Sequence, residues 1–357
     1  MGLKIGVTFN VRLASSVRQP ESFSTSRPGS ASFALGRDDL DEEFDSPETI
    51  HALAGVLEGF GHEVELLGDG EPLVRRLLSG PRPDLVWNIA EGTGGGRSRE
   101  ARVPAVLEMF DIPYTGSDPL TLAATLDKDC AKRLVTLSGV STPPWVLFRG
   151  NWTESRPALA KLNFPVFAKP AYEGSSKGIL ATSVLIDLEQ LKHALATLFE
   201  AYRQPVLVEE FIDGDELTVG LVGNQPPEVV GIMRVLPQKP AKGPFVYSLE
   251  VKRDWQHQVH YECPARLSPN DSEAVAAAAL ACWHALGCRD VSRFDFRLRD
   301  GVPYFLETNP LPGLSPISGD LVLMSGRVGI EYPELISRIL QAALERLNLV
   351  QDASFAV

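Results

Sequence analysis

Ser292-Arg293-Phe294-Asp295-Phe296 is followed on the same chain by Phe305-Leu306-Glu307-Thr308-Asn309-Pro310. Both stretches alternate polar with apolar residues, and this pattern predicts two β-strands because successive side chains of a strand point to opposite faces. Arg293 and Asp295 would then share one face of the first strand. Glu307 and Asn309 would share one face of the second, while the apolar side chains pin both strands to a core.

The polar side chains of the two strands suggest a site for a metal ion and phosphate. Carboxylate and amide oxygens are hard ligands, and Mg²⁺ prefers a couple of carboxylates plus substrate phosphates to a full protein cage. Asp295, Glu307 and Asn309 are therefore the predicted metal ligands, with Arg293 beside them. Taken alone, the two strands are also compatible with solvated edge strands whose charged residues face water.

An apolar stretch over residues 164–168 ends at Lys169 and precedes the loop Glu173-Gly174-Ser175-Ser176-Lys177-Gly178. Small residues between two glycines let backbone N–H groups approach an anion, and a lysine at the strand end can reach the same anion. The loop lacks the glycine spacing of a Walker A motif. A phosphate-covering loop is thus one interpretation, and a plain surface hairpin is the other.

Residues 206–212 are predicted to form an apolar strand, followed by an Asp213-Gly214 turn and a second strand over 215–219. Acidic side chains lie where a ribose or an adenine amino group could be held.

Four helices are predicted from other signals. Three begin with a Ser or Asp N-cap followed by Pro, at residues 46–47, 118–119 and 268–269, and the fourth has an apolar stripe over residues 331–347. The second of these helices is expected to carry Asp127 and Lys128.

The order of these motifs resembles the ATP-grasp fold, and more narrowly the D-alanine:D-alanine ligase family. Matching motifs extend upstream to Asn88–Gly92, and the resemblance covers roughly residues 84–345. It implies an α/β fold of three domains with nucleotide bound between the central and C-terminal domains. The expected domains are an N-terminal α/β domain over 1–120 with a mobile insertion at 18–46, a central domain over 121–212, and a C-terminal domain over 213–357 that carries the metal site.

The resemblance also implies roles for individual residues. The implied ATP-binding residues are Lys128, Lys169, Glu173, Gly174, Ser175, Ser176, Glu209, Glu210, Phe211, Ile212, Glu216 and Lys252. Two Mg²⁺ ions, which Mn²⁺ could replace, are implied on Asp295, Glu307 and Asn309. Arg293, Gly313 and Ser175 are the implied catalytic groups, and Ser318 resembles a group that meets the carboxylate of the second amino acid.

The chain departs from the family at its N-terminal end. The family has a glycine-rich strand exit with a glutamate that binds the first substrate's ammonium group, but residues 4–13 lack that signature. Glu43, Asp45 and Glu48 are candidate replacements, and the sequence does not choose between them.

A second departure is the segment Gly92–Glu100, which replaces the family's loop around the first substrate. Arg97 and Arg99, with Glu91 nearby, are predicted to reach the amino-acid pocket, which would favour a substrate that carries an extra carboxylate. The alternative is a basic helix start on the surface.

Composition fits an enzyme that acts on small molecules. The chain has 357 residues, of which 44% are hydrophobic and 22% charged, and a net charge of −12 argues against nucleic-acid and membrane-surface partners. No apolar run approaches a membrane span, no signal peptide is recognisable, and the four cysteines show no CxxC spacing. These features predict a cytoplasmic protein with small amino-acid or carboxylate substrates, and they leave a homodimer open.

The predicted function is that of an ATP-dependent carboxylate–amine ligase. It would form an amide or dipeptide bond through an acyl phosphate and release ADP and phosphate. Two alternatives remain at this stage. One is an ATP-grasp enzyme with a non-amide outcome, such as cyclisation or ligation to a thiol, and the other is a non-catalytic nucleotide-binding protein.

Overall fold

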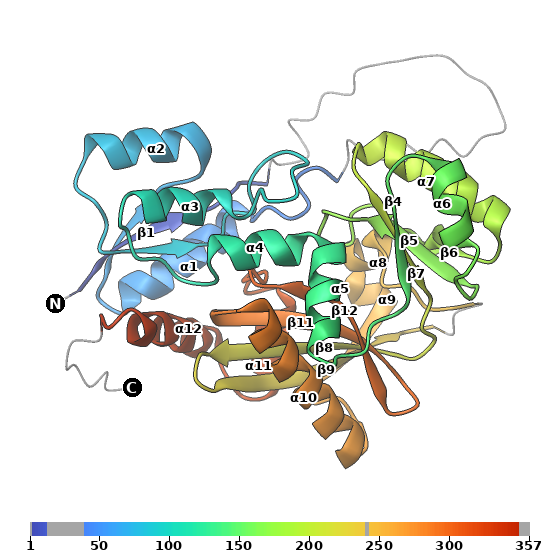
Figure 1. Cartoon of the computed structure of the whole chain (residues 1–357). Coiled ribbons are helices and arrows are strands. Elements are labelled where there is room, and N and C mark those ends of the chain that lie inside the picture. The colour runs from blue at the N-terminus through green and yellow to red at the C-terminus, as the bar shows by residue number, and fades with distance from the viewer. Residues whose placement is uncertain (1, 13–38, 240–242, 350–357) are drawn as a thin grey trace.

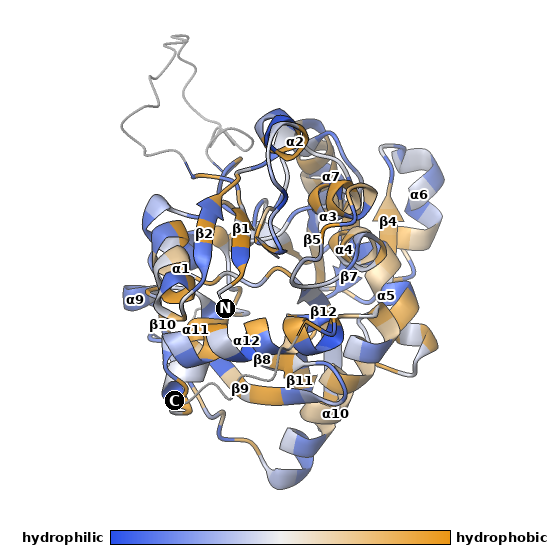
Figure 2. Ribbon diagram, turned by 90° about the vertical axis from the view of Figure 1, so that its left-hand side faces the viewer, coloured by the Kyte–Doolittle hydropathy of each residue, from blue (hydrophilic) through white to orange (hydrophobic). Residues whose placement is uncertain are grey.

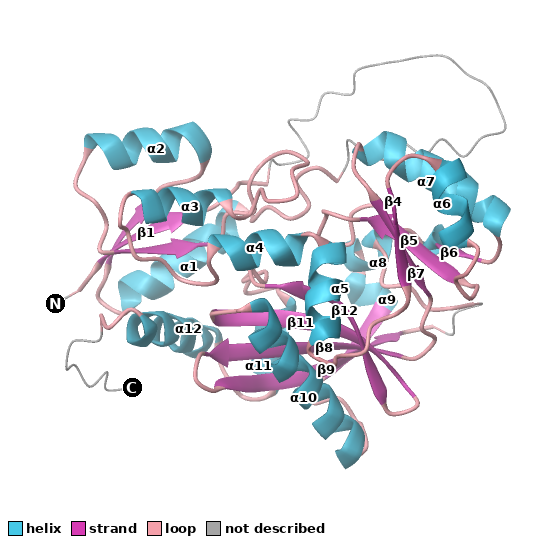
Figure 3. Ribbon diagram, in the orientation of Figure 1, coloured by secondary structure: helices cyan, strands magenta, loops and turns pink. Residues whose placement is uncertain are grey.

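The computed structural model describes residues 2–12, 39–239 and 243–349, and it folds them into three β-sheets that helices cover (Figures 1 and 3). Each sheet is built from a separate stretch of the chain. The expected α/β class is therefore confirmed.

The first sheet is parallel and has the strand order β2-β1-β3. Its strands are β1 (Lys4–Thr8), β2 (Glu63–Leu66) and β3 (Leu85–Asn88), and its helices are α1 (Pro47–Gly59), α2 (Gly70–Ser79) and α3 (Arg102–Met109). The predicted start of α1 is confirmed, because the Ser46 side chain accepts a hydrogen bond from the Thr49 N–H at 3.2 Å. Beyond the strand ends, Asn10 Oδ1 accepts from the Gly92 N–H at 2.8 Å and directs the following loop toward the site.

Two helices, α4 (Pro119–Leu126) and α5 (Lys128–Leu137), connect the first sheet to the second. The sequence predicted one helix here, but the helix is interrupted at Asp127, where α4 ends and α5 begins. The Asp127 carboxylate caps α5 by accepting from the N–H groups of Asp129 and Cys130. Lys128 thereby becomes the first residue of α5.

The second sheet is antiparallel and has the strand order β4-β7-β5-β6. Its strands are β4 (Trp145–Phe148), β5 (Val166–Pro170), β6 (Val184–Leu185) and β7 (Val206–Glu210), and α6 (Trp152–Leu159), the short helix η2 (Ala181–Ser183) and α7 (Leu188–Tyr202) accompany it. Its core includes Leu191 and Leu195 of α7 packed on Val166 and Val208. In Figure 2 the outward-facing helix α6 is largely hydrophilic.

The third sheet is antiparallel and has the strand order β10-β9-β8-β11-β12. Its strands are β8 (Asp215–Gly223), β9 (Pro227–Pro237), β10 (Val259–Glu262), β11 (Asp290–Arg299) and β12 (Val302–Asn309), and its helices are α8 (Leu249–Arg253), α9 (Trp255–Gln258), α10 (Pro269–Leu286), α11 (Asp320–Arg327) and α12 (Tyr332–Arg346). Phe294 and Phe296 of β11 are fully buried against α10. This packing turns the alternate residues of β11 toward the site.

The predicted strands on either side of the Asp213-Gly214 turn are present, but they belong to different sheets: β7 pairs with β4 and β5, whereas β8 pairs with β9 and β11. The predicted mobile insertion at 18–46 lies outside the described residues up to residue 38. Residues 39–46 are described and are mostly buried or half-buried, with Asp39 only 4% exposed, although Leu40 is 61% exposed.

Within the described part of the chain, none of the helices combines the length and the apolar character needed to cross a membrane.

Candidate active site

The antiparallel pairing of β11 with β12 places Asp295 opposite Glu307 and Arg293 opposite Asn309. Arg293 donates two hydrogen bonds to Asp295, at 2.9 and 3.2 Å, and its other terminal nitrogen lies 2.8 Å from Asp320. Asn309 Nδ2 also donates to Asp295, at 3.2 Å. The structure thus brings together all four residues that strand alternation had placed on these faces. Because β11 lies between β8 and β12, the alternative of two solvated edge strands is wrong for β11.

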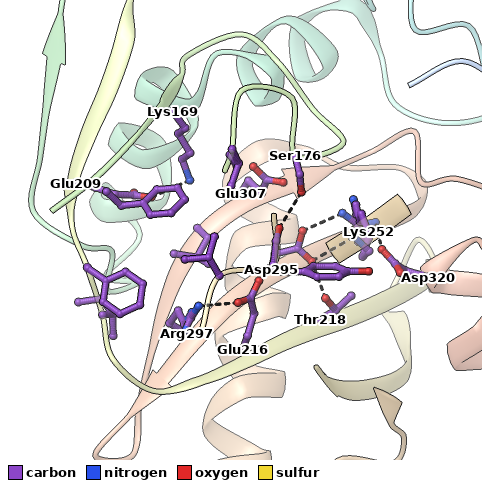
Figure 4. Close-up of a pocket in the computed structure, with 18 of the residues that line it drawn as sticks. Lys169, Ser176, Glu209, Glu216, Thr218, Lys252, Asp295, Arg297, Glu307 and Asp320 are labelled. Atoms are coloured by element: carbon purple, nitrogen blue, oxygen red, sulfur yellow. Dashed lines mark hydrogen bonds and ion pairs between the residues drawn. The ribbon is translucent and has the colours of Figure 1, made fainter. Parts of the chain in front are cut away.

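A cavity opens between the second and third sheets on this face of β11 (Figure 4). Most of the predicted nucleotide-binding residues line it. They are Lys169, Ser176, Glu209, Glu210, Phe211, Ile212, Glu216 and Lys252, together with Arg293, Asp295 and Glu307. The short linker between β7 and β8 forms one edge of the cavity. The chain passes from the second sheet to the third along this linker, so the linker is part of the cavity wall.

One side of the cavity contains a buried chain of three charged residues. Lys169 Nζ lies 2.8 Å from one oxygen of Glu209, and Lys132 Nζ lies 2.7 Å from the other. Burial disfavours ionisation of Glu209, but the two ammonium groups outweigh it and lower the pKa of the carboxyl. Lys132 was not found from the sequence, because it sits on α5 with no motif around it. The fold buries it completely, and its Nζ donates to the Phe305 carbonyl at 3.3 Å.

The opposite side is built around Glu216, whose carboxylate accepts from Arg297 at 2.7 Å. The Arg297 guanidinium also lies over the Phe211 ring, 5.1 Å from its centroid. Burial raises the pKa of Glu216 in spite of that arginine. Arg297 follows Asp295 by two residues and could have been found by extending the same alternation along β11.

A second cavity adjoins the first and shares Arg293 with it. Lys128, Glu173, Gly174 and Ser175 line it from one direction. Asn309 and Gly313 line it from another, and Glu43, Glu91 and Glu100 come from the N-terminal part of the chain. Lys128 Nζ lies 3.2 Å from Glu307 and donates to the Glu173 carbonyl, so the two cavities are separated by little more than this lysine and Arg293.

The loop at 173–178 is fixed by Glu43. One Glu43 oxygen accepts from the Gly174 N–H at 2.5 Å and from Arg99 at 2.7 Å, and the other lies 3.1 Å from Lys177. Although burial opposes ionisation, Arg99 and Lys177 lower the pKa of the Glu43 carboxyl. Of the three candidate replacements for the family's N-terminal acid, Glu43 is therefore the one that lines the second cavity.

Three predicted substrate residues lie elsewhere. Arg97 is exposed and pairs with Asp127 at 2.7 Å. Arg99 is buried, but its guanidinium is directed to Glu43 and to the Tyr172 carbonyl and is not among the residues that line the second cavity. Ser318 is exposed and hydrogen-bonds to Ser315. The two arginines thus do not supply the free positive charge that the sequence predicted in the amino-acid pocket.

The donor set at Asp295, Glu307 and Asn309 suits magnesium that also binds phosphate. Burial opposes ionisation of Glu307, but Lys128 and Lys169 lower the pKa of its carboxyl to about 2, which keeps it charged. Among the described residues no three acidic, histidine or cysteine side chains form a complete metal cage. Two carboxylates and an amide beside a nucleotide-sized cavity leave positions that phosphate oxygens can fill.

Comparisons with known proteins agree with this geometry. Residues 134–341 match the family model described as "D-ala D-ala ligase C-terminus". The chain is 31% identical to the D-alanine–D-alanine ligase of Fervidobacterium nodosum over 83% of this chain and 93% of that protein. It is also 36% identical to "Uncharacterized protein y4sG" of Sinorhizobium fredii, over 83% of this chain and 87% of the other.

Solved structures share the fold. A D-alanine–D-alanine ligase from Bacillus anthracis, complexed with ATP, superposes with a TM-score of 0.70 at 23% identity, covering 98% of this chain and 99% of that one. With the family model matching more than half of the sequence, the chain belongs to the D-alanine–D-alanine ligase family.

Proposed function

We propose that this protein is an ATP-dependent ligase that joins the carboxylate of one amino acid to the amine of another, with an acyl phosphate as intermediate. The observation that carries the proposal is the shared wall of the two cavities. Arg293 lines both, so a phosphate at the end of the first cavity would meet a carboxylate in the second. ATP would occupy the first cavity, since its walls supply lysines for phosphates and Glu216 for a ribose.

The first step is transfer of the terminal phosphoryl group to the substrate carboxylate. Lys169 and Lys128 neutralise negative charge on the transferring group. If Mg²⁺ ions are bound, Asp295, Glu307 and Asn309 would hold them, and the ions would neutralise further charge on the phosphates. The buried pair with Glu209 fixes the direction of Lys169.

The second step is attack of an amine on the activated carbonyl. Arg293 and the backbone near Gly313 face the position where the oxyanion would develop, and they stabilise it by charge and hydrogen bonding. Enclosure by loop 173–178, which Glu43 ties down, keeps water from hydrolysing the acyl phosphate. The second amino acid's binding group remains a prediction at Ser318. We place the reaction in the cytoplasm, where ATP is available, and a homodimer also remains a prediction.

The test compares ADP release and product mass in Asp295→Asn, Glu307→Gln and Glu58→Gln proteins. Glu58 is exposed on α1 and lines neither cavity, and it serves as the matched control. The first two variants should lose at least about a hundredfold in turnover, equivalent to about 3 kcal/mol of barrier, with unchanged circular dichroism. Near-normal turnover in both variants would show that Asp295 and Glu307 do not form a metal site that the reaction needs. ADP release without an amide product would instead favour a non-amide outcome.

A further inference from the structure

The wall of the second cavity is acidic. Of the charged side chains that line it, Glu43, Glu91, Glu100 and Glu173 are carboxylates, and only Lys128 and Arg293 are cations. The cavity is also where the proposed function puts the amino-acid substrates. A ligand can pair only with those charged side chains that no other protein group already binds.

Both lining cations are already paired. Arg293 is held between Asp295 and Asp320, and Lys128 lies against Glu307 and the Glu173 carbonyl. Arg99, which stands behind the wall, is also used, because Glu43 accepts from it at 2.7 Å.

Two of the lining carboxylates are not paired. Glu91 and Glu100 face the cavity and make no hydrogen bond or ion pair with any described residue. Glu100 is only 7% exposed, so its carboxylate has little access to water outside the cavity. A buried carboxylate without a partner is costly, and both groups show it. Burial raises the pKa of Glu100 to about 8 in spite of the nearby charges of Arg99 and Lys128, and burial together with the charges of Glu100 and Glu43 raises the pKa of Glu91 in spite of Arg99.

Ammonium groups of simple amino acids cannot satisfy both carboxylates throughout the reaction. Two alanine-like substrates bring one ammonium group each. The amine that attacks must first lose its proton to become a nucleophile, so it no longer offers a positive charge. Only one lasting cation then remains for these two acids, of which Glu100 is buried, while both oxygens of a third acid, Glu43, already have partners.

We propose that one amino-acid substrate of this enzyme carries a second cationic group, an amine or guanidinium on its side chain, which Glu91 and Glu100 bind. This inference rests on the proposed ligase function and deepens it. The sequence had predicted a substrate with an extra carboxylate, bound by Arg97 and Arg99. Those arginines instead bind protein groups: Arg97 pairs with Asp127, and Arg99 contacts Glu43 and the Tyr172 carbonyl. A free carboxylate pair selects a cation in the same way that a free arginine would have selected an anion.

The test is a substrate screen with the whole chain, Mg²⁺ and ATP. ADP release and product mass are measured for D- and L-forms of alanine, serine, glutamate, lysine, ornithine and arginine, alone and in pairs. A basic amino acid should be used with a kcat/KM at least about tenfold above that of alanine. Efficient ligation of alanine or serine with no advantage for basic amino acids would overturn the substrate class and leave the ligase function standing. Absence of ADP release with every amino acid would overturn the ligase function itself.

Substitutions test whether Glu91 and Glu100 cause the preference for a basic substrate. Glu91→Gln and Glu100→Gln should each raise the KM of the basic substrate about tenfold or more while the KM for ATP stays within about twofold, and Glu58→Gln should change neither. An unchanged ratio of basic to neutral kcat/KM in both variants would overturn the assignment of these two residues. Should either variant fail to fold, calorimetric binding of lysine, ornithine and alanine to the wild-type protein with ADP decides the matter, because equal affinity for all three also overturns the proposal.

Discussion

Replacement of Glu209 by glutamine should reveal how strongly the nucleotide cavity depends on one buried charge. Glu209 lies 2.7 Å from Lys132 and 2.8 Å from Lys169, and all three side chains are at most 5% exposed. A neutral amide in its place leaves two buried ammonium groups facing each other without an acid. Removal of one partner from a buried ion pair typically costs about 3–5 kcal/mol, and we expect a loss of that size in the free energy of unfolding at pH 7.

The pH dependence follows from Lys132. Burial lowers the pKa of Lys132 from 10.5 to about 8 in the native protein. The native state therefore binds fewer protons than the unfolded state between about pH 8 and 10.5, so stability from this group rises with pH across that window. At 1.36 kcal/mol per pKa unit, the rise is about 3 kcal/mol. Without Glu209 the pKa of Lys132 falls further, and the recovery should begin below pH 8.

Urea unfolding between pH 6 and 9 measures both effects. The deficit of Glu209→Gln relative to wild type should shrink as pH rises toward 8. A Lys132→Met, Glu209→Gln double variant should recover part of the loss at pH 7, since removal of both partners of a buried pair is far less costly than removal of one. Glu58→Gln should match wild type throughout.

Two results would refute this reasoning. One is a Glu209→Gln protein within about 1 kcal/mol of wild type at pH 7, well below the range for a broken buried pair. The other is a double variant no more stable than Glu209→Gln alone.

Further predictions concern the N-terminal contacts of the site. Arg99→Met should lower the melting temperature markedly, because it leaves Glu43 short of a cation in a buried setting, whereas Arg97→Ala removes an exposed pair and should cost less than about 1 kcal/mol. Equal thermal stability of the two variants would contradict their different placement. Limited proteolysis should cut loop 173–178 faster in Glu43→Gln than in wild type, and a Mg·ATP analogue should protect the loop in wild type. Cleavage that is indifferent to both changes would show that Glu43 does not restrain the loop and that nucleotide does not bind beneath it.

Strand alternation predicted more of this site than any other signal. It placed Arg293 with Asp295 and Glu307 with Asn309, because a period of two leaves only two faces to choose from. It did not show that β11 is an internal strand, which depends on pairing with β8, some seventy residues earlier. Nor did it show that Arg293 would be held by Asp320, a residue from the start of α11.

Loop residues were predicted less well. Arg97 and Arg99 lie two residues apart in a segment without periodicity, yet one is exposed and the other is 2% exposed. Their surroundings are decided by distant partners, since Glu43 lies 56 residues before Arg99. The same reasoning explains why the sequence could not show that Glu100 is unpaired, because an unpaired carboxylate is recognised only when its neighbours are known. The family resemblance could indicate where the amino-acid pocket lies, but not which of the charged side chains around it are left without a partner.

The junction around residues 10–12 and 45 has a consequence for how the chain can vary. Val11 and Asp45 form a short parallel bridge, in which the Arg12 N–H donates to the Asp45 carbonyl at 2.9 Å and the Asp45 N–H to the Asn10 carbonyl at 3.1 Å. The bridge fixes Asp45 beside the end of β1, and Glu43 lies only two residues before Asp45. Variation that displaces Asp45 would therefore also displace Glu43 from Gly174 and Arg99.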